Sequence, residues 1–569
     1  MSNPAGPRRG YELNPALAGQ PAESIERLIF PNLADKPIPF IDGSIEATHA
    51  ALHAISAAMV GGTDDMCLEN PGPIPAGYTY FSQFVFHDMA FTRLENRNHG
   101  YTARVASPHI ASDCTAALDL DTLYGSGPVF EPMLYKAPDS RFGHRCEFVT
   151  GMPGEQILPG EMTETERANA RDLPRIALDG CGATSARSRN PRYSQPVVAD
   201  ARNDHHLILA QMHATFLKVH NRIVGVLRAN GAEPQEAFEI TRAFVGSSYR
   251  KAIFLDYLPR ILHPAIYREL FGRRFDAYLP RRGQPGVALG IPLEFTFGTG
   301  RLGHAMSRSV YRVNRFRPEA PLPEIINLSS EAPDAKLPVS ADWYIDWTNF
   351  FEFSTLASKV QSARRISPFM SSAMAQDTTT ILADTDRSIG FMDMWRCYER
   401  RLPSGQTLAR RINREIGDLF GTELTPKGGI PILEKAAMLP SDAFAAVYPA
   451  DAERLRAALV AAPEFLVHTP LFYYLAQEAA VLGEEGGRLG PVGSFILAVA
   501  ARQALAETDE PGVETTPHDL RHSAGIGTVP GIIEIAEAGV MTDEHLYDLV
   551  STFAGQMRRA GRHHRFGPV

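Results

Sequence analysis

An aromatic segment from Tyr80 to Met89 carries the residues with the clearest chemical potential in this chain. It sets Gln83 and His87 four residues apart, a spacing that puts both side chains on one face of a helix. Most of their neighbours are aromatic or apolar, so this polar face needs a polar group to face. A neutral histidine there can accept a proton from a bound ligand and return it to a departing oxygen.

Two residues far along the chain fit the same chemistry. Arg202 could stabilise the charge that develops on an oxygen when a peroxide bond breaks. His304 follows a glycine-rich stretch that would let a flat macrocycle approach, and histidine is the usual axial ligand of haem iron in peroxidases. We therefore predict His87 as the base, Arg202 as the charge stabiliser and His304 as the iron ligand. Gln83 would hold a water or halide over the iron, on the distal side.

Taken alone, each of these residues has an ordinary structural explanation. His87 could be a hydrogen-bonded core histidine, and Arg202 could form an ion pair with a neighbouring aspartate.

An axial histidine usually donates its second N–H to an acceptor, and Asp393 is our candidate for that acceptor. Arg396 could pair with a haem propionate.

The segment from Thr115 to Asp121 suggests a cation site. Asp119 and Asp121 are two residues apart, so an extended loop would present both to one side. With Asp88, the Thr115 hydroxyl and the Ala117 carbonyl, they would offer the oxygen ligands that calcium prefers. The alternative is a turn capped by aspartates.

Composition limits the class of protein. The chain has 569 residues, 44% of them hydrophobic and 21% charged, as in an ordinary globular protein. A net charge of -9 argues against nucleic acid as the main partner. The five cysteines form no close pair with metal spacing, which favours a reducing compartment. With neither a Sec-type signal nor a spanning apolar run, we expect no membrane span and a cytoplasmic protein, leaving export by a non-Sec route open.

Helical periodicity dominates the chain, so we predict a mainly α fold: one large helical domain with few short strands. Expected helices are 206–227, 236–262, 352–364, 471–482 and 492–505. We place an N-terminal arm at 1–40, the main domain at 41–507, and a C-terminal extension with one or two small helices at 508–569.

The ordered motifs resemble the animal-type haem peroxidases of the peroxidase–cyclooxygenase superfamily, and the chain looks like a bacterial-like member. The similar segments are Ser82–Asp88 (the distal GQ-xx-DHD segment), Thr115–Gly125 (the calcium loop), Ala199–Arg202, Met212–Arg222 (close to LHTLFLREHNR), Gly303–His304 and Leu402–Gly405. The resemblance implies a helical fold around one haem. It implies the same roles for His87, Gln83, Arg202 and His304. It also implies that Arg396 binds a haem propionate.

The chain departs from the family where mammalian members attach the haem covalently. Phe86 stands in place of one ester-forming aspartate, and His205 in place of the glutamate. His206 replaces the methionine that forms a sulfonium link. The resemblance with these changes implies a non-covalent haem b.

The family's proximal asparagine is here Asp393. A carboxylate gives the axial histidine more imidazolate character and stabilises high-valent iron. We therefore expect hydrogen peroxide and an easily oxidised donor as substrates, such as iodide, thiocyanate, a phenol or another organic molecule, rather than chloride.

Two other functions stay open from the sequence, and the sequence leaves the oligomeric state undetermined. A fatty-acid dioxygenase of the cyclooxygenase type needs a tyrosine radical, placed in that group three residues before the proximal histidine. Arg301 occupies that position here, although Tyr311 or Tyr344 could serve. A non-catalytic haem or adhesion protein is the third possibility.

Overall fold

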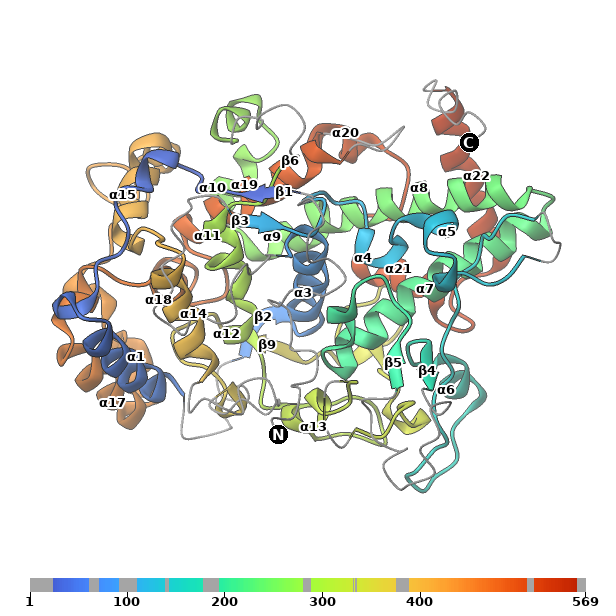
Figure 1. The fold of residues 1–569 in the computed structure, drawn as a ribbon, viewed down its shortest axis with the longest axis horizontal. Coiled ribbons are helices and arrows are strands. Elements are labelled where there is room, and N and C mark those ends of the chain that lie inside the picture. Colours follow the sequence, from blue (N-terminus) through green and yellow to red (C-terminus); the bar gives the residue numbers. More distant parts are fainter. Residues whose placement is uncertain are drawn as a thin grey trace, which may run out of the picture.

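The computed structural model describes residues 24–60, 71–91, 110–138, 143–177, 194–279, 288–330, 332, 335–374, 388–508 and 516–559. Helices form most of the described chain, as predicted (Figure 1). The longer helices are α1 (Ile45–Met59), α3 (Gly77–Met89), α7 (Leu207–Ala229), α8 (Pro234–Ala252), α14 (Ile389–Glu399), α15 (Gly405–Ile416), α17 (Pro449–Val460), α18 (Leu471–Leu482), α19 (Pro491–Glu507) and α22 (Asp543–Arg559).

Short helices and strands connect these elements. The short helices are α4 (Asp121–Tyr124), α5 (Gly127–Phe130), α6 (Glu164–Asn169), α9 (Leu258–Ile261), α10 (Pro264–Glu269), α11 (Leu293–Thr296), α12 (Gly303–Met306), α13 (Leu322–Ile326), α16 (Asp442–Val447), α20 (Pro517–His522) and α21 (Val529–Ala536). The strands are β1 (Ser24–Glu26), β2 (Pro71–Pro75), β3 (Ile110–Ser112), β4 (Arg175–Ala177), β5 (Ser194–Pro196), β6 (Ala288–Leu289), β7 (Val310–Tyr311), β8 (Ala320–Pro321) and β9 (Ser362–Arg364).

The described strands form small sheets. β1 pairs antiparallel with β3 and parallel with β6, and three further pairs join β2 to β9, β4 to β5 and β7 to β8. Part of the predicted N-terminal arm is thus tied into a sheet by β1.

The helix α7 lies at the centre of the packing. Its apolar residues recur at helical spacing, from Leu209 through Phe216 to Ile223, and all three are buried. The His206 side chain accepts the Leu209 N–H and caps the helix N-terminus. α7 packs against α3, α8, α21 and α22, so it connects the distal segment to the C-terminal helices.

Four of the five expected helices are present. α7, α18 and α19 fall where the sequence predicted them, and the region 236–262 is helical but contains a π-helical turn, η8 (Ile253–Tyr257), between α8 and α9. The helix predicted at 352–364 is wrong. There the N–H groups of Lys359 and Gln361 donate to the carbonyls of Thr348 and Asn349, so the backbone bonds are non-local, and the segment ends in β9.

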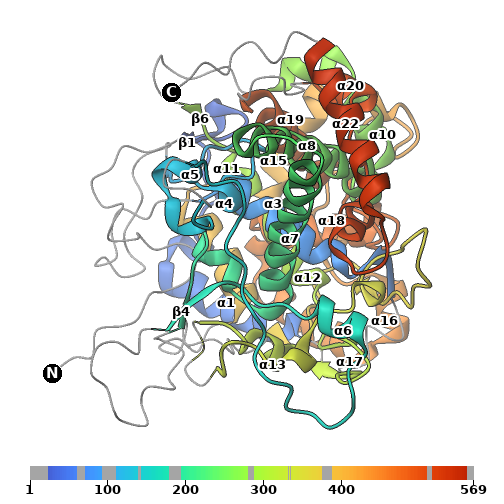
Figure 2. The same ribbon diagram turned by 90° about the vertical axis from the view of Figure 1, so that its right-hand side faces the viewer.

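The C-terminal segment contains more helix than expected. The described part holds α20, α21 and the 17-residue α22, rather than one or two small helices. α22 lies beside α8, with α20 near it (Figure 2). The proposed boundaries at residues 40 and 508 stay predictions.

Two further expectations concern membranes and cysteines. No helix among the described residues is long and apolar enough to cross a bilayer. Cys114, Cys146 and Cys397 form no disulfide bond with one another, while Cys67 and Cys181 lie outside the described residues.

A buried glutamate joins α18 to α19. The Glu478 carboxylate accepts the N–H groups of Val492 and Gly493 at the start of α19, and the side chain is fully buried. Burial raises the pKa of Glu478 to about 8, more than these hydrogen bonds lower it.

Because this pKa is raised above its ordinary value of 4.5, the folded state binds the extra proton and stability falls as pH rises from about 4.5 to about 8. We expect Glu478→Gln to leave the Tm nearly unchanged at pH 5.5 and to raise it relative to the parent at pH 9. Calorimetry at the two pH values measures this difference, with Glu453→Gln on the surface as the control. A Tm difference independent of pH would contradict the account.

Candidate active site

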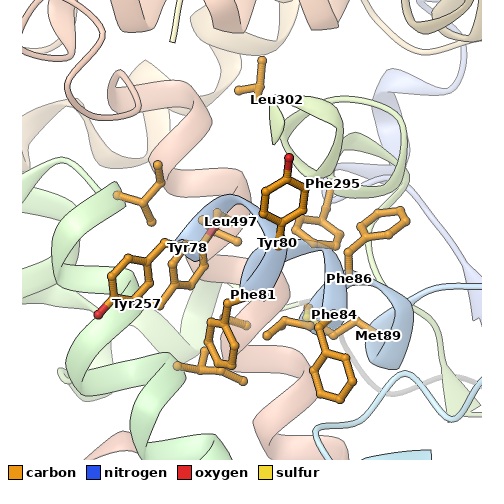
Figure 3. Close-up of a cluster of buried hydrophobic side chains, with 14 of the residues drawn as sticks. Tyr78, Tyr80, Phe81, Phe84, Phe86, Met89, Tyr257, Phe295, Leu302 and Leu497 are labelled. Carbon is orange, nitrogen blue, oxygen red and sulfur yellow. The ribbon is translucent and has the colours of Figure 1, made fainter. Parts of the chain in front are cut away.

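The distal residues are carried by α3, whose aromatic side chains fix it in the core. Tyr78, Phe81 and Phe84 are buried around it, and Figure 3 shows Phe86 beside Phe295 near the helix. At Gly77 a side chain would collide with Phe351, so the start of the helix can approach that ring closely. The predicted helix is confirmed, and Gln83 and His87 share one face of it.

His87 is buried and held by an amide bridge. Its Nδ1 lies 2.9 Å from Asn203 Oδ1, and Asn203 Nδ2 lies 2.9 Å from His213 Nδ1. In this arrangement Nδ1 of His87 donates, so Nε2 keeps its lone pair. Burial, assisted by the nearby Arg202 charge, lowers the pKa of His87 to about 4. His87 is therefore a neutral imidazole with a fixed tautomer, as a general base requires.

Arg202 lies directly behind the end of α3. Its Nε and Nη2 donate to Asp200, Nη1 donates to the Ala90 carbonyl and Nη2 to the His87 carbonyl. The guanidinium also stacks over Phe91, 4.1 Å from the ring centre. Four of its five N–H groups are therefore bound to protein. In the structure Arg202 caps the last carbonyl groups of α3. Its role as charge stabiliser stays a prediction.

Two residues at the family's covalent attachment positions, His205 and His206, also lie on this side. The rings of His87 and His205 are 5.5 Å apart and meet edge to face. His206 Nε2 lies 2.9 Å from Gln83 Oε1. Phe86 points its ring at Phe295 and at the Arg301 guanidinium. The segment after Arg202 thus binds the distal helix through hydrogen bonds.

The predicted proximal contact is confirmed. His304, on α12, places Nδ1 2.6 Å from Asp393 Oδ2, and Arg396 Nη1 donates to Asp393 Oδ1 at 3.1 Å. Asp393 is fully buried on α14. Burial alone would raise the pKa of Asp393, but His304, Arg396 and Arg301 together hold it below its ordinary value. His304 therefore has an anionic partner that would hold its Nδ1 proton.

The two sides adjoin each other, and their residues fit a haem. α12 packs against α3. The His304 side chain is 33% exposed, and no residue described in the structure bonds its Nε2, which leaves that nitrogen for an axial bond. A side chain added at Gly303 would meet nothing within 4 Å, and Gly303 lines a small apolar cavity. The identity of His304 as the iron ligand stays a prediction.

A small apolar cavity lies on a different face of α3. It has a volume of about 40 Å³ and is lined by Val85, Phe86 and Met89, with residues of η8 and α19 opposite. This volume is too small for a macrocycle, and Gln83 and His87 do not line it.

The predicted calcium residues come together. One carboxylate oxygen each of Asp88, Asp119 and Asp121 lies within 4.8 Å of the others, and the Thr115 hydroxyl donates to Asp119. Oδ1 of Asp88 and Oδ1 of Asp121 are buried without a hydrogen bond to any described residue. Burial and mutual repulsion raise the pKa of Asp121 to about 7 and that of Asp88 well above its ordinary value. These orphaned oxygens fit a cation.

The loop that presents them is bent rather than extended. Leu120, between the two aspartates, adopts a left-handed conformation with φ of 58°, and Asp121 begins α4. Leu120 N–H also donates to Asp88, which ties the loop to the distal helix.

Sequence reasoning missed Asn203 and Arg301 as site residues. Asn203 lies directly after Arg202, and its role depends on His213 in the second turn of α7, which the motif alone does not indicate. Arg301 is buried, and burial with the nearby Arg396 charge lowers its pKa to about 9. Arg301 lies three residues before His304, and Arg396 lies three residues after Asp393. This pair of arginines suits a ligand with two carboxylates, such as the two propionates of a haem.

Residues 56–376, more than half of the chain, match the animal haem peroxidase family model, and the chain belongs to that family.

Known relatives resemble parts of it. Thyroid peroxidase of Mus musculus is 26% identical over 200 residues, and that of Homo sapiens is 26% identical over 201, each match covering 35% of this chain. The match spans a fifth of the length of these relatives. Peroxidase A from Dictyostelium discoideum has a similar fold, with a TM-score of 0.55, 14% identity, and coverage of 92% of this chain and 95% of that one.

Proposed function

We propose that this protein uses hydrogen peroxide to oxidise a small donor at a non-covalently bound haem b. The observation that carries the proposal is the hydrogen-bond bridge from His87 through Asn203 to His213. His87 lies on α3, and α3 packs against α12, the helix of His304, whose Nδ1 is bonded to the Asp393 carboxylate. One imidazole is prepared to accept a proton, and the other is prepared to bind iron.

The bound haem, held by His304 with Arg396 and Arg301 at its propionates, would supply two electrons to peroxide. The protein's own residues accept and transfer the protons. His87 Nε2 would accept a proton from one peroxide oxygen and deliver it to the other, which leaves as water when the O–O bond breaks. The donor then returns two electrons, and with two protons the second oxygen also leaves as water.

Charge on the departing oxygen needs stabilisation. Arg202 supplies a buried positive charge directly behind α3, with one N–H group left beyond its bonds to Asp200 and the helix carbonyls. Gln83, on the same helix face as His87, contributes amide groups that can hold a water or an anion.

The donor follows from the proximal pair. Because Asp393 withdraws the Nδ1 proton of His304 more strongly than an amide would, the iron potential should be low. We therefore propose iodide, thiocyanate, a phenol or another easily oxidised molecule as donor, with poor chloride oxidation.

The dioxygenase alternative lacks support at the residues that it needs. Arg301 occupies the position three residues before His304 and donates to the Thr296 carbonyl. The Tyr344 hydroxyl donates to Glu166, and the Tyr311 hydroxyl accepts the Arg308 N–H. Oxygen uptake with a polyunsaturated fatty acid would favour the alternative; its absence, with peroxide turnover, favours the peroxidase.

The first prediction concerns His87. We expect peroxide to shift the Soret band of the haem-loaded protein within seconds, and His87→Ala to slow that reaction by about 10²–10⁴-fold, the usual contribution of a general acid–base group. Stopped-flow spectra measure the rate. Ser82→Ala, on another face of α3, is the control. An unchanged rate in His87→Ala would refute the role of His87.

The second prediction concerns haem attachment. Phe86 and His206 have no carboxylate, and His205 cannot form the ester of the family's glutamate. We expect acidified organic solvent to extract all the haem, leaving colourless protein, as measured by absorbance and by the mass of the intact chain. A mass increase equal to haem would contradict the non-covalent proposal.

The third prediction concerns calcium, which we propose binds Asp88, Thr115, the Ala117 carbonyl, Asp119 and Asp121. A chelator should lower the Tm by several degrees and calcium should restore it, because three close carboxylates repel one another without a cation. Asp121→Ala should reduce this response, and Asp113→Asn should retain it. Equal Tm values with chelator and calcium in the parent would refute the site.

A further inference from the structure

The position of one proton on His206 follows from backbone geometry. The backbone N–H of Leu209 donates to His206 Nδ1 at 3.3 Å, because His206 caps the N-terminus of α7. A nitrogen that accepts a hydrogen bond carries no proton, so the neutral ring must carry its proton on Nε2. The Tyr80 and His206 rings pack edge to face, with ring centres 5.1 Å apart.

This proton fixes the orientation of the Gln83 amide. His206 Nε2 lies 2.9 Å from the Gln83 side chain, and a donor there requires the oxygen Oε1 as its partner. The two N–H groups of the Gln83 amide therefore point elsewhere. No residue that the structure describes accepts a hydrogen bond from them. Gln83 is only partly buried, and it shares the face of α3 that carries His87.

We propose that His206 is a positioning residue that makes the distal site offer hydrogen-bond donors, rather than an acceptor, to a bound anion. The proposal rests on the proposed function, since it concerns the same site. The Leu209 N–H fixes the tautomer of His206, and this tautomer fixes the orientation of the Gln83 amide. It matters because most of the Arg202 N–H groups are already bound to Asp200 and α3, so Gln83 supplies the donors that are free.

Two substitutions at position 206 test whether the side chain there orients the Gln83 amide or only occupies the space beside it. His206→Gln keeps a side-chain N–H that reaches Gln83 Oε1, whereas His206→Glu offers only acceptors. In His206→Glu the Gln83 amide should turn so that its N–H groups face position 206 and its oxygen faces the ligand. The two introduced side chains have the same size and reach, so any loss of the helix cap is common to both.

Fluoride is a suitable probe, because it accepts hydrogen bonds and does not donate them. Its dissociation constant for the ferric haem-loaded protein, read from the Soret band at fixed pH, is independent of turnover. We expect His206→Gln to bind fluoride within about threefold of the parent. His206→Glu should bind it about tenfold to a hundredfold more weakly, the value of a charge-assisted hydrogen bond lost.

The negative charge of glutamate would itself repel fluoride, so the comparison is repeated with Gln83→Ala. If position 206 acts through the Gln83 amide, the ratio between the dissociation constants of the His206→Glu and His206→Gln variants should shrink to a few-fold in that background. An equal ratio in both backgrounds would overturn the proposal, as would equal fluoride affinity of the two single variants.

The result is separable from the proposed function. Failure of the parent to react with peroxide would refute peroxidase activity while leaving the fluoride cycle readable. A normal peroxide reaction with an uncoupled fluoride cycle would refute only the role of His206.

Discussion

The site depends on one segment, Asp200–His206, that binds the distal helix at several points. Asp200 holds the Arg202 guanidinium against the last carbonyls of α3, Asn203 holds the His87 ring, and His206 holds Gln83. Each of these polar groups lies where water is excluded or scarce, so an unmade hydrogen bond there would be costly. The same segment continues directly into α7, the helix with the most central packing. The His87 ring is therefore held by a hydrogen bond from the segment that leads into α7.

Charge is balanced separately on the two sides of the site. On the distal side, the Arg202 cation is neutralised by Asp200 and its field helps to keep the His87 pKa low, so His87 is neutral and able to accept a proton. On the proximal side, the Asp393 anion lies among His304, Arg396 and Arg301. The two arginines beside this carboxylate suit a ligand with acidic side groups. Near α4, three carboxylates lie close together, an arrangement that suits a cation.

The sequence predicted most of the fold because long helices repeat their apolar residues, as in α7 and α18, and because motifs in order identify the family. It also predicted the His304–Asp393 contact, because an axial histidine usually has an acceptor for its second N–H. It failed where the backbone bonds were non-local, as at Lys359 and Gln361. It missed the Asn203 bridge for the same reason: the partner, His213, is in contact only once α7 has packed against α3. It could not show that Arg202 is turned to the helix carbonyls, since that depends on where α3 ends.

The substitutions at the attachment positions have a common physical consequence. Where the mammalian proteins that the sequence resembles carry carboxylate and thioether side chains, this chain has two imidazoles and a phenyl ring, which contact other side chains of the protein. His206 binds Gln83 and caps α7, His205 lies against His87, and Phe86 packs on Phe295. An ester would fix the cofactor and leave the distal side chains to adapt to it. Here the distal side chains are fixed by one another, and the cofactor must fit a surface whose donors and acceptors are already assigned. Such a site should lose its geometry through single hydrogen-bond changes at Asn203 or His206, at positions that never touch the iron.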